Sequence, residues 1–335
     1  MKMVKGAAVL GLACLANSAM ADDALTVYSY RQAFLVEPIL EQFTQDTGIK
    51  VNVVFAKDGI AERIAREGRL SPADVVLTSD FSRLMELVEK DLVSPVNNEV
   101  INNNIPEVYR SPKNEWYALT MRVRNVYSSK ERTGKVDINY EDLAKPEYKG
   151  KICTRSGKHP YNVALVASMI AHHGEADTKT WLEGVKSNLA RKPQGNDRDQ
   201  VLAVKEGMCD FAIGNSYYYG NMMMDENQKS WAEAVYINFP NQDNRGAHIN
   251  VSGMALAKFS PNKDNAIKLM EFLTSNVAQQ AYADVNMEYP VKADVKPSKL
   301  VASWGEFKAD PLPIYKLAEN HQAAVKLLDE VKFDL

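Results

Sequence analysis

Histidine and cysteine are scarce in this sequence, with five and three copies in 335 residues. The histidines are scattered, and the adjacent pair His172–His173 points two ways on a helix, so no set has the spacing of a zinc site. The chain also lacks a P-loop, a G-x-S-x-G elbow, an H-E-x-x-H motif and a G-x-G-x-x-G turn. These absences exclude the common catalytic and nucleotide-binding signatures.

Neither sign of charge dominates, because 40 Lys and Arg stand against 43 Asp and Glu, for a formal net charge of −3. No basic cluster stands out, so we expect no nucleic-acid partner. With 45% hydrophobic and 25% charged residues the composition is that of a globular protein, and the length suits two domains. Disordered, collagen-like and disulfide-scaffold classes are excluded.

The apolar run near the N-terminus is short. Two lysines precede about ten apolar residues (7–16), and residues 19–21 form the small-x-small pattern that signal peptidase recognises. Such a run is too short to span a bilayer, and no later segment has eighteen consecutive apolar residues. Cys14 raises a lipoprotein alternative, but the residues before it match a lipidation motif poorly. We predict a signal peptide, residues 1–21, cleaved after Ala21, and a periplasmic location.

Two cysteines, Cys153 and Cys209, remain in the predicted mature chain. In an exported protein such a pair can form a disulfide. The alternative is two small buried hydrophobic residues in neighbouring strands. The sequence leaves both possibilities open.

Strands alternate with helices in two separate series. In the first, strands at residues 25–28, 49–55 and 74–77 are separated by helical patterns, and in the second, strands at 152–154 and 209–213 enclose helices. This alternation predicts two α/β cores, each with a mainly parallel sheet.

Extended segments lie between the two cores. Residues 117–127 and 234–239 are candidates for strands that cross between lobes, and residues 250–257 would return the chain to the first core. Two lobes joined by such strands form a hinged molecule whose ligand lies in the cleft at the carboxyl ends of the strands. The predicted first lobe comprises 22–122 and 247–297, and the second comprises 123–246 and 298–335.

Tyrosines follow two strands of the second core. Tyr217, Tyr218 and Tyr219 come directly after the strand 209–213, and Tyr161 begins the helix after the strand that ends near Cys153. Adjacent tyrosines between glycines do not suit a hydrophobic core, because each buried hydroxyl needs a polar partner. The alternative is an aromatic loop that stacks on a ligand or simply packs.

Convergent phenols would suit one kind of metal. A phenol with an ordinary pKa of about 10 ionises at neutral pH only beside a strong cation. Hard anionic oxygens suit a hard trivalent cation such as Fe³⁺, and three phenolates would balance its charge. Tyrosine also ligates iron in haem catalase.

Five segments in this order carry a family resemblance: Val27–Gln32, Ser71–Val75, Gly150–Gly157, Pro193–Gln200 and Asn215–Gly220. Through them the chain resembles the periplasmic ferric ion-binding proteins, the substrate-binding components of bacterial iron(III) ABC transporters. The resemblance covers essentially the whole mature chain. It implies an α/β, two-lobed periplasmic binding protein fold, class II-like, with two crossing hinge strands.

The resemblance also implies iron ligands. Tyr217 and Tyr218 match the family's tyrosine pair, Tyr161 matches the third tyrosine of some members, and Tyr219 would be a neighbour. Many relatives place a histidine or a histidine–tyrosine pair where this chain has Gln32-Ala33, and others a glutamate where Ser79 stands. The first lobe therefore offers no strong protein ligand.

About half of a six-coordinate shell is then left for another group. The family commonly uses a synergistic anion, here carbonate or bicarbonate, and Arg122 matches the arginine that holds it; a salt bridge in the cleft is the alternative for this residue. Ser156 and Gly157 precede a helix N-terminus, which also favours an anion. Gln32, Arg124 and Tyr30 are weaker candidates for the cleft.

We therefore expect a monomeric periplasmic protein, not an enzyme, that captures ferric iron from a free or chelated source and delivers it to an inner-membrane ABC permease. Two alternatives stay open: a binding protein for an organic cation or oxyanion, and an exported metal-dependent enzyme. The sequence identifies neither the anion nor the iron source, and it does not show a preference for Fe³⁺ over Fe²⁺.

Overall fold

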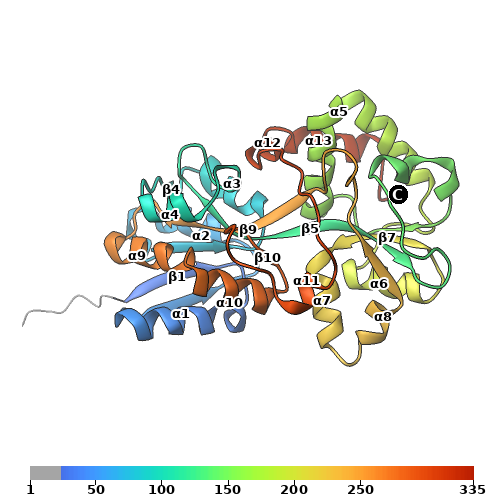
Figure 1. Cartoon of the computed structure of the whole chain (residues 1–335). Helices are drawn as coiled ribbons and strands as arrows, with labels where there is room; N and C mark the ends of the chain where they lie inside the picture. The colour runs from blue at the N-terminus through green and yellow to red at the C-terminus, as the bar shows by residue number, and fades with distance from the viewer. Residues whose placement is uncertain (1–23) are drawn as a thin grey trace, which may run out of the picture.

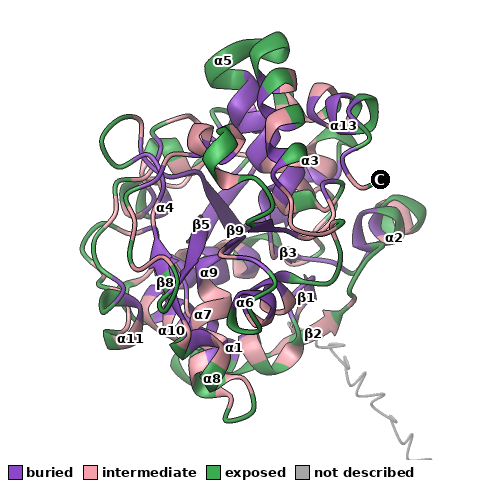
Figure 2. Cartoon of the chain, turned by 90° about the vertical axis from the view of Figure 1, so that its right-hand side faces the viewer, coloured by how far each residue is buried: buried purple, intermediate pink, exposed green. Residues whose placement is uncertain are grey.

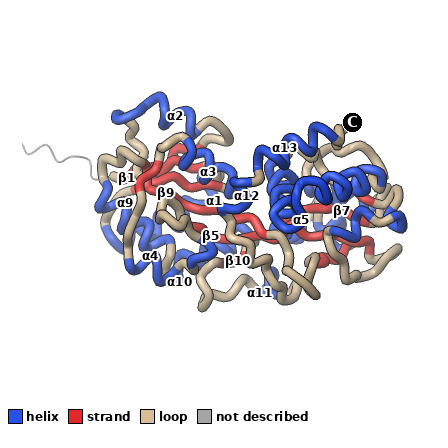
Figure 3. The backbone as a smooth tube through the Cα atoms, turned by 90° about the horizontal axis from the view of Figure 1, so that it is seen from above, coloured by secondary structure: helices blue, strands red, loops and turns tan. Residues whose placement is uncertain are grey.

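The chain forms two lobes joined by a long strand, as a computed structural model describes for residues 24–335 (Figure 1). The predicted signal peptide, with the cleavage site after Ala21, lies outside the described residues. Seen from above, helices surround the strands of each lobe, and β5 (Tyr117–Ser129) runs from one lobe into the other (Figure 3).

The sheet of the first lobe has the strand order β2-β1-β3-β9-β5. Here β1 is parallel to both β2 and β3, whereas β9 is antiparallel to β3 and β5. Short strands β4 and β10 pair with β9 and β5. The strands are β1 (Leu25–Ser29), β2 (Val51–Phe55), β3 (Val75–Thr78), β4 (Val93–Ser94), β9 (Ile249–Ala257) and β10 (Tyr289–Pro290).

Helices cover this sheet because each has a buried apolar stripe, such as Ile39, Leu40 and Phe43 of α1. Asp80 caps α3 by accepting hydrogen bonds from the backbone of its first turn, as residues of this type do at helix starts. The helices are α1 (Ala33–Thr47), α2 (Ile60–Glu67), α3 (Phe81–Glu89), α4 (Glu99–Asn104), α9 (Lys263–Leu273) and α10 (Asn276–Asn286).

The second lobe is built on the other half of β5. There β7 (Phe211–Asn215) and β8 (Val235–Asn238) pair antiparallel with β5, and β6 (Ile152–Cys153) is parallel to β7. The strand interiors are buried, whereas the outer helix faces are exposed (Figure 2). The remaining helices are α5 (Pro160–Ser187), α6 (Asp197–Lys205), α7 (Ser216–Met224), α8 (Lys229–Glu233), α11 (Lys299–Ala302), α12 (Tyr315–Glu319) and α13 (His321–Glu330).

One of the two predicted crossing segments is confirmed and the other is wrong. Residues 117–123 of β5 pair with β9 in the first lobe, and residues 124–129 pair with β7 and β8 in the second. The segment 234–239 does not cross, because among residues 24–335 β8 pairs only with the second-lobe half of β5, Val126–Ser129. The chain returns to the first lobe through β9, as predicted for 250–257. The lobe boundaries themselves stay predictions.

Cys153 and Cys209 form a disulfide, with 6.0 Å between their Cα atoms. Cys153 is the last residue of β6, and Cys209 lies just before β7. The bond therefore links the two strands that precede the tyrosines. This finding decides between the two possibilities that the sequence left open.

Candidate metal centre

Three tyrosines reach one site from two helices of the second lobe. Tyr161 is the second residue of α5, and Tyr217 and Tyr218 lie in the first turn of α7. The strands that precede these helices, β6 and β7, are parallel neighbours. Their carboxyl ends therefore share one edge of the sheet, which is where ligands bind in such folds.

The phenols are in contact. The hydroxyl oxygens of Tyr161 and Tyr217 lie 3.2 Å apart, and the ring centroids of Tyr217 and Tyr218 are 4.1 Å apart. Tyr219 points elsewhere, because its ring stacks on Tyr127 and meets the edge of the Trp304 ring. The structure thus brings together the three predicted ligands and places the fourth tyrosine in apolar packing.

Tyr217 and Tyr218 resist ionisation when no cation is bound. Burial raises the pKa of Tyr217 well above its ordinary value, and the neighbouring Tyr161 and Tyr218 raise it further, while Arg122 opposes the shift. Burial and Tyr161 likewise raise the pKa of Tyr218. Tyr217 and Tyr218 are therefore neutral phenols at pH 7, and a strongly charged cation would convert them to phenolates.

Guanidinium groups surround the phenols. The Arg122, Arg124 and Arg155 guanidinium carbons lie 5.7, 5.9 and 5.4 Å from the centre of the Tyr161 ring. Arg198 lies 5.4 Å from the centre of the Tyr218 ring. Positive charge at this range favours the ionised form of a phenol.

Arg124 is held within the second lobe through both of its Nη atoms, while its Nε has no hydrogen-bond partner in the described part of the chain. It donates to Asp197 at 2.6 Å, to Asn215 at 3.1 Å and to Asn162 at 2.7 Å. Asp197 is completely buried and also pairs with Arg155 at 3.1 Å. This network orients the strand ends that carry the tyrosines, and it engages more of the donors of Arg124 than of Arg122.

Arg122 is different, because most of its hydrogen-bonding capacity is unused. It is 1% exposed and donates from Nη2 to the carbonyl oxygen of Ser79. Its Nε and Nη1 have no hydrogen-bond partner among residues 24–335. A buried donor without a partner costs free energy that an oxyanion would recover.

Arg122 makes a long ion pair with Glu288 but no hydrogen bond to it, so the salt bridge that was the alternative role for Arg122 is present in a weak form. Its Nη1 lies 3.9 Å from Glu288, and that carboxylate already accepts from Arg31 at 2.8 Å and from the hydroxyl of Thr120. Sequence reasoning missed Glu288 and Arg31, since nothing in the local pattern connects residues 257 positions apart.

The anion role predicted for Ser156 and Gly157 needs correction. The Ser156 hydroxyl donates to one carboxylate oxygen of Asp334 at 2.5 Å, and the Gly157 N–H donates to the other at 2.7 Å. A carboxylate of the chain itself therefore occupies the donors that the helix start would offer to an anion.

In the part of the chain that the structure describes, no hydrogen bond or ring contact joins the weaker first-lobe candidates, Gln32 and Tyr30, to the three phenols. Gln32 is exposed at the start of α1, and its side chain makes no capping hydrogen bond. The Tyr30 hydroxyl accepts from the Ala61 N–H at 3.2 Å, inside the first lobe. Within residues 24–335, no group of three His, Cys, Asp or Glu residues is placed to hold a metal.

His159 supports Tyr161 in a way that its spacing did not reveal. Its Nδ1 accepts from the Tyr161 N–H at 3.3 Å, and the two ring centroids are 4.5 Å apart. Burial, and then the charge of Arg155, lower the pKa of His159 to about 4, so the ring is neutral at pH 7 and can accept this hydrogen bond.

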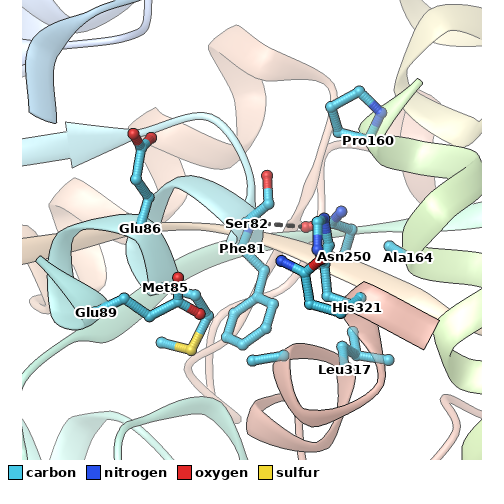
Figure 4. A pocket seen from close by; sticks show the side chains of 12 residues that line it. Phe81, Ser82, Met85, Glu86, Glu89, Pro160, Ala164, Asn250, Leu317 and His321 are labelled. Carbon is cyan, nitrogen blue, oxygen red and sulfur yellow. Dashed lines mark hydrogen bonds between the residues drawn. The ribbon is translucent and has the colours of Figure 1, made fainter. Parts of the chain in front are cut away.

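A cavity of about 300 Å³ lies beside the centre, between the lobes (Figure 4). Phe81 and Met85 of α3 line it from the first lobe, and Pro160 and Ala164 of α5 line it from the second. Asn250 lies at the back, where its side-chain oxygen accepts from the Phe81 N–H at 3.0 Å. The interlobe space therefore opens next to Tyr161.

Two α/β lobes that share a strand, with polar side chains gathered at the strand ends, define a two-lobed binding protein. The chain belongs to the family of bacterial extracellular solute-binding proteins, whose family model matches residues 28–280. Within residues 24–335, no helix has the length and apolar character needed to cross a membrane.

Several relatives are named for iron. Iron uptake protein A1 of Synechocystis is 42% identical over 310 residues, which are 91% of this chain and 86% of that protein. The structure of Mannheimia haemolytica ferric iron-binding protein A in an open conformation is 56% identical, with a TM-score of 0.91, and the match covers 93% of this chain and 99% of that one.

A further structure, the Trichodesmium protein in complex with iron and citrate ligands, is 37% identical with a TM-score of 0.89, over 92% of this chain and 99% of that one. These findings confirm the family resemblance, the two-lobed fold and the prediction of a binding protein rather than an enzyme.

Proposed function

We propose that this protein binds ferric iron in the periplasm through the phenolates of Tyr161, Tyr217 and Tyr218 and delivers it to an inner-membrane ABC permease. The contact between phenols from two separate helices carries the proposal. Three hard, anionic oxygens match the charge and hardness of Fe³⁺. The names of the relatives, which include iron uptake and ferric iron-binding proteins, support the same cargo.

A synergistic anion completes the iron shell in this proposal. The unpartnered Nε and Nη1 of Arg122 leave N–H donors of a planar, permanently charged guanidinium free, which suits an oxyanion such as carbonate. Because Arg122 is buried beside the Tyr161 ring, an anion held there would lie next to the phenolates.

Capture then works by lobe closure. Iron binds to the second lobe (123–246 and 298–335), and the first lobe (22–122 and 247–297) closes over it about the crossing strands. Export as a monomer, with cleavage after Ala21, precedes this step. The mass of the purified periplasmic protein tests the cleavage site, and its elution volume tests the monomer.

The decisive experiment is a visible spectrum of the apo protein during titration with ferric citrate, with and without bicarbonate. A broad phenolate-to-iron charge-transfer band that saturates at one iron per chain is expected. Tyr217→Phe should abolish or strongly weaken it. Tyr219→Phe is the matched control, because that phenol packs away from the site, and it should leave the band unchanged.

A colourless iron-loaded protein would refute phenolate coordination. In that case the tyrosines serve another ligand, and binding of an organic cation or oxyanion becomes the leading function. A bicarbonate effect on the band that is present in the wild type and lost in Arg122→Gln supports the anion role of Arg122, and an effect that survives this substitution refutes it.

A further inference from the structure

The turn before α5, residues 156–159, contacts Phe333 and Asp334 on its outer side. Besides the two hydrogen bonds from Ser156 and Gly157 to Asp334, the ring of Phe333 lies against Gly157 so closely that an added Cβ would be 2.7 Å from it. The helix that leads into this segment, α13, packs along α5 (Figure 1). Both oxygens of the Asp334 carboxylate are used on this one turn.

The same turn is fixed from inside by Asn162. Its side-chain nitrogen donates to the carbonyl oxygens of Arg155 and Ser156, both at 3.1 Å, and its oxygen accepts from Arg124 at 2.7 Å. The turn is therefore clamped between the buried charge network of the second lobe and the carboxylate of Asp334.

The clamped turn leads directly to a phenol of the metal centre. The His159 N–H donates to the Ser156 carbonyl oxygen at 3.1 Å, and the His159 ring contacts Tyr161. Tyr161 in turn brings its hydroxyl to 3.2 Å from that of Tyr217. A shift of the turn would therefore move a phenol that must meet iron within a fraction of an ångström.

We propose that Asp334 is a positioning residue for iron binding, which holds the Tyr161 phenol in place through Ser156, Gly157 and His159. This proposal rests on the proposed function of the phenols. Charge-assisted hydrogen bonds are stronger than neutral ones, so the carboxylate resists displacement of the turn better than water would. Supporting groups of this kind set the orientation of metal ligands.

The test compares iron affinity, measured by competition with citrate, and the visible band in Asp334 variants. Asp334→Ala is expected to weaken iron binding about tenfold and to shift or weaken the band, in line with losses at other supporting groups. Asp334→Asn keeps an oxygen for the Gly157 N–H and should restore most of the affinity. Asp329→Asn is the matched control, because Asp329 pairs with the exposed Lys158 of the same turn.

A double-mutant cycle separates positioning from general stability. If Asp334 acts through Tyr161, then Asp334→Ala should change iron affinity less than about twofold in a Tyr161→Phe background. The same tenfold loss in that background would overturn the proposal, and so would wild-type affinity and band in Asp334→Ala. A wild-type protein without any band overturns the proposed function instead, so the two failures are distinguishable.

Discussion

Iron binding at this centre should release protons in proportion to the number of phenols that become ligands. Burial raises the pKa of Tyr217 and of Tyr218, so these phenols stay protonated from about pH 5 to pH 8 in the apo protein. Each phenol that binds iron must lose its proton, because only the phenolate is a ligand. With Tyr161 in contact with Tyr217, the geometry predicts about three protons per iron.

The affinity for iron should fall as the pH is lowered, because lower pH opposes the release of protons that accompanies iron binding. Three coupled protons make the apparent affinity for Fe³⁺ fall by about 1,000-fold for each pH unit, after correction for the protonation of the competing chelator. Bicarbonate that binds as carbonate adds about one further proton.

A pH-stat titration with ferric citrate in carbonate-free, weakly buffered solution measures this quantity directly. The difference between wild type and Tyr217→Phe should be about one proton per iron, and it does not depend on the iron source. Tyr219→Phe should release as many protons as wild type. Equal proton release by wild type and Tyr217→Phe would refute phenolate binding by Tyr217.

Three further predictions follow from the structure. Arg122→Gln should still bind iron, but bicarbonate should no longer tighten binding or reduce the radius of gyration in X-ray scattering; a retained bicarbonate effect would contradict the anion role. Asp197→Ala leaves Arg124 buried without its counter-ion and should lower the free energy of unfolding by about 3–5 kcal/mol in a urea titration. Reduction of the disulfide Cys153–Cys209, which closes a loop of 56 residues, should lower it by about 4 kcal/mol, and a change under 1 kcal/mol would contradict the loop-entropy argument.

The convergence of the tyrosines could be predicted because it depends on local rules. A parallel strand fixes where its carboxyl end lies, so a side chain that directly follows the strand can be placed without knowledge of the rest of the fold. Tyr217, which closely follows β7, obeys this rule, whereas Tyr161 is separated from β6 by the turn before α5; their hydroxyls meet because the strand ends share one edge of the sheet. The periodicity of the strands likewise predicted β5 as a crossing strand.

The long-range partners could not be predicted in this way. Asp334 reaches Ser156 across 178 positions, and Glu288 reaches Arg31 across 257, through packing within each lobe that no periodicity encodes. The error at β8 has a related cause. A short strand of alternating exposure looks the same in sequence whether it crosses between lobes or, like Val235–Asn238, pairs within one.

The position of Arg122 within β5 would give the proposed anion a role beyond filling the iron shell. The sheet partner of β5 changes between Val123 and Arg124, so Arg122 belongs to the first-lobe sheet, whereas Arg124 is held by Asp197 of the second lobe. A ligand shifts a conformational equilibrium only through contacts that differ between the two states. Iron bound to phenols of one lobe alone makes no such contact, so it cannot by itself favour closure. An anion that bridges iron and Arg122 would join the two sheets, and closure would then require both iron and the anion.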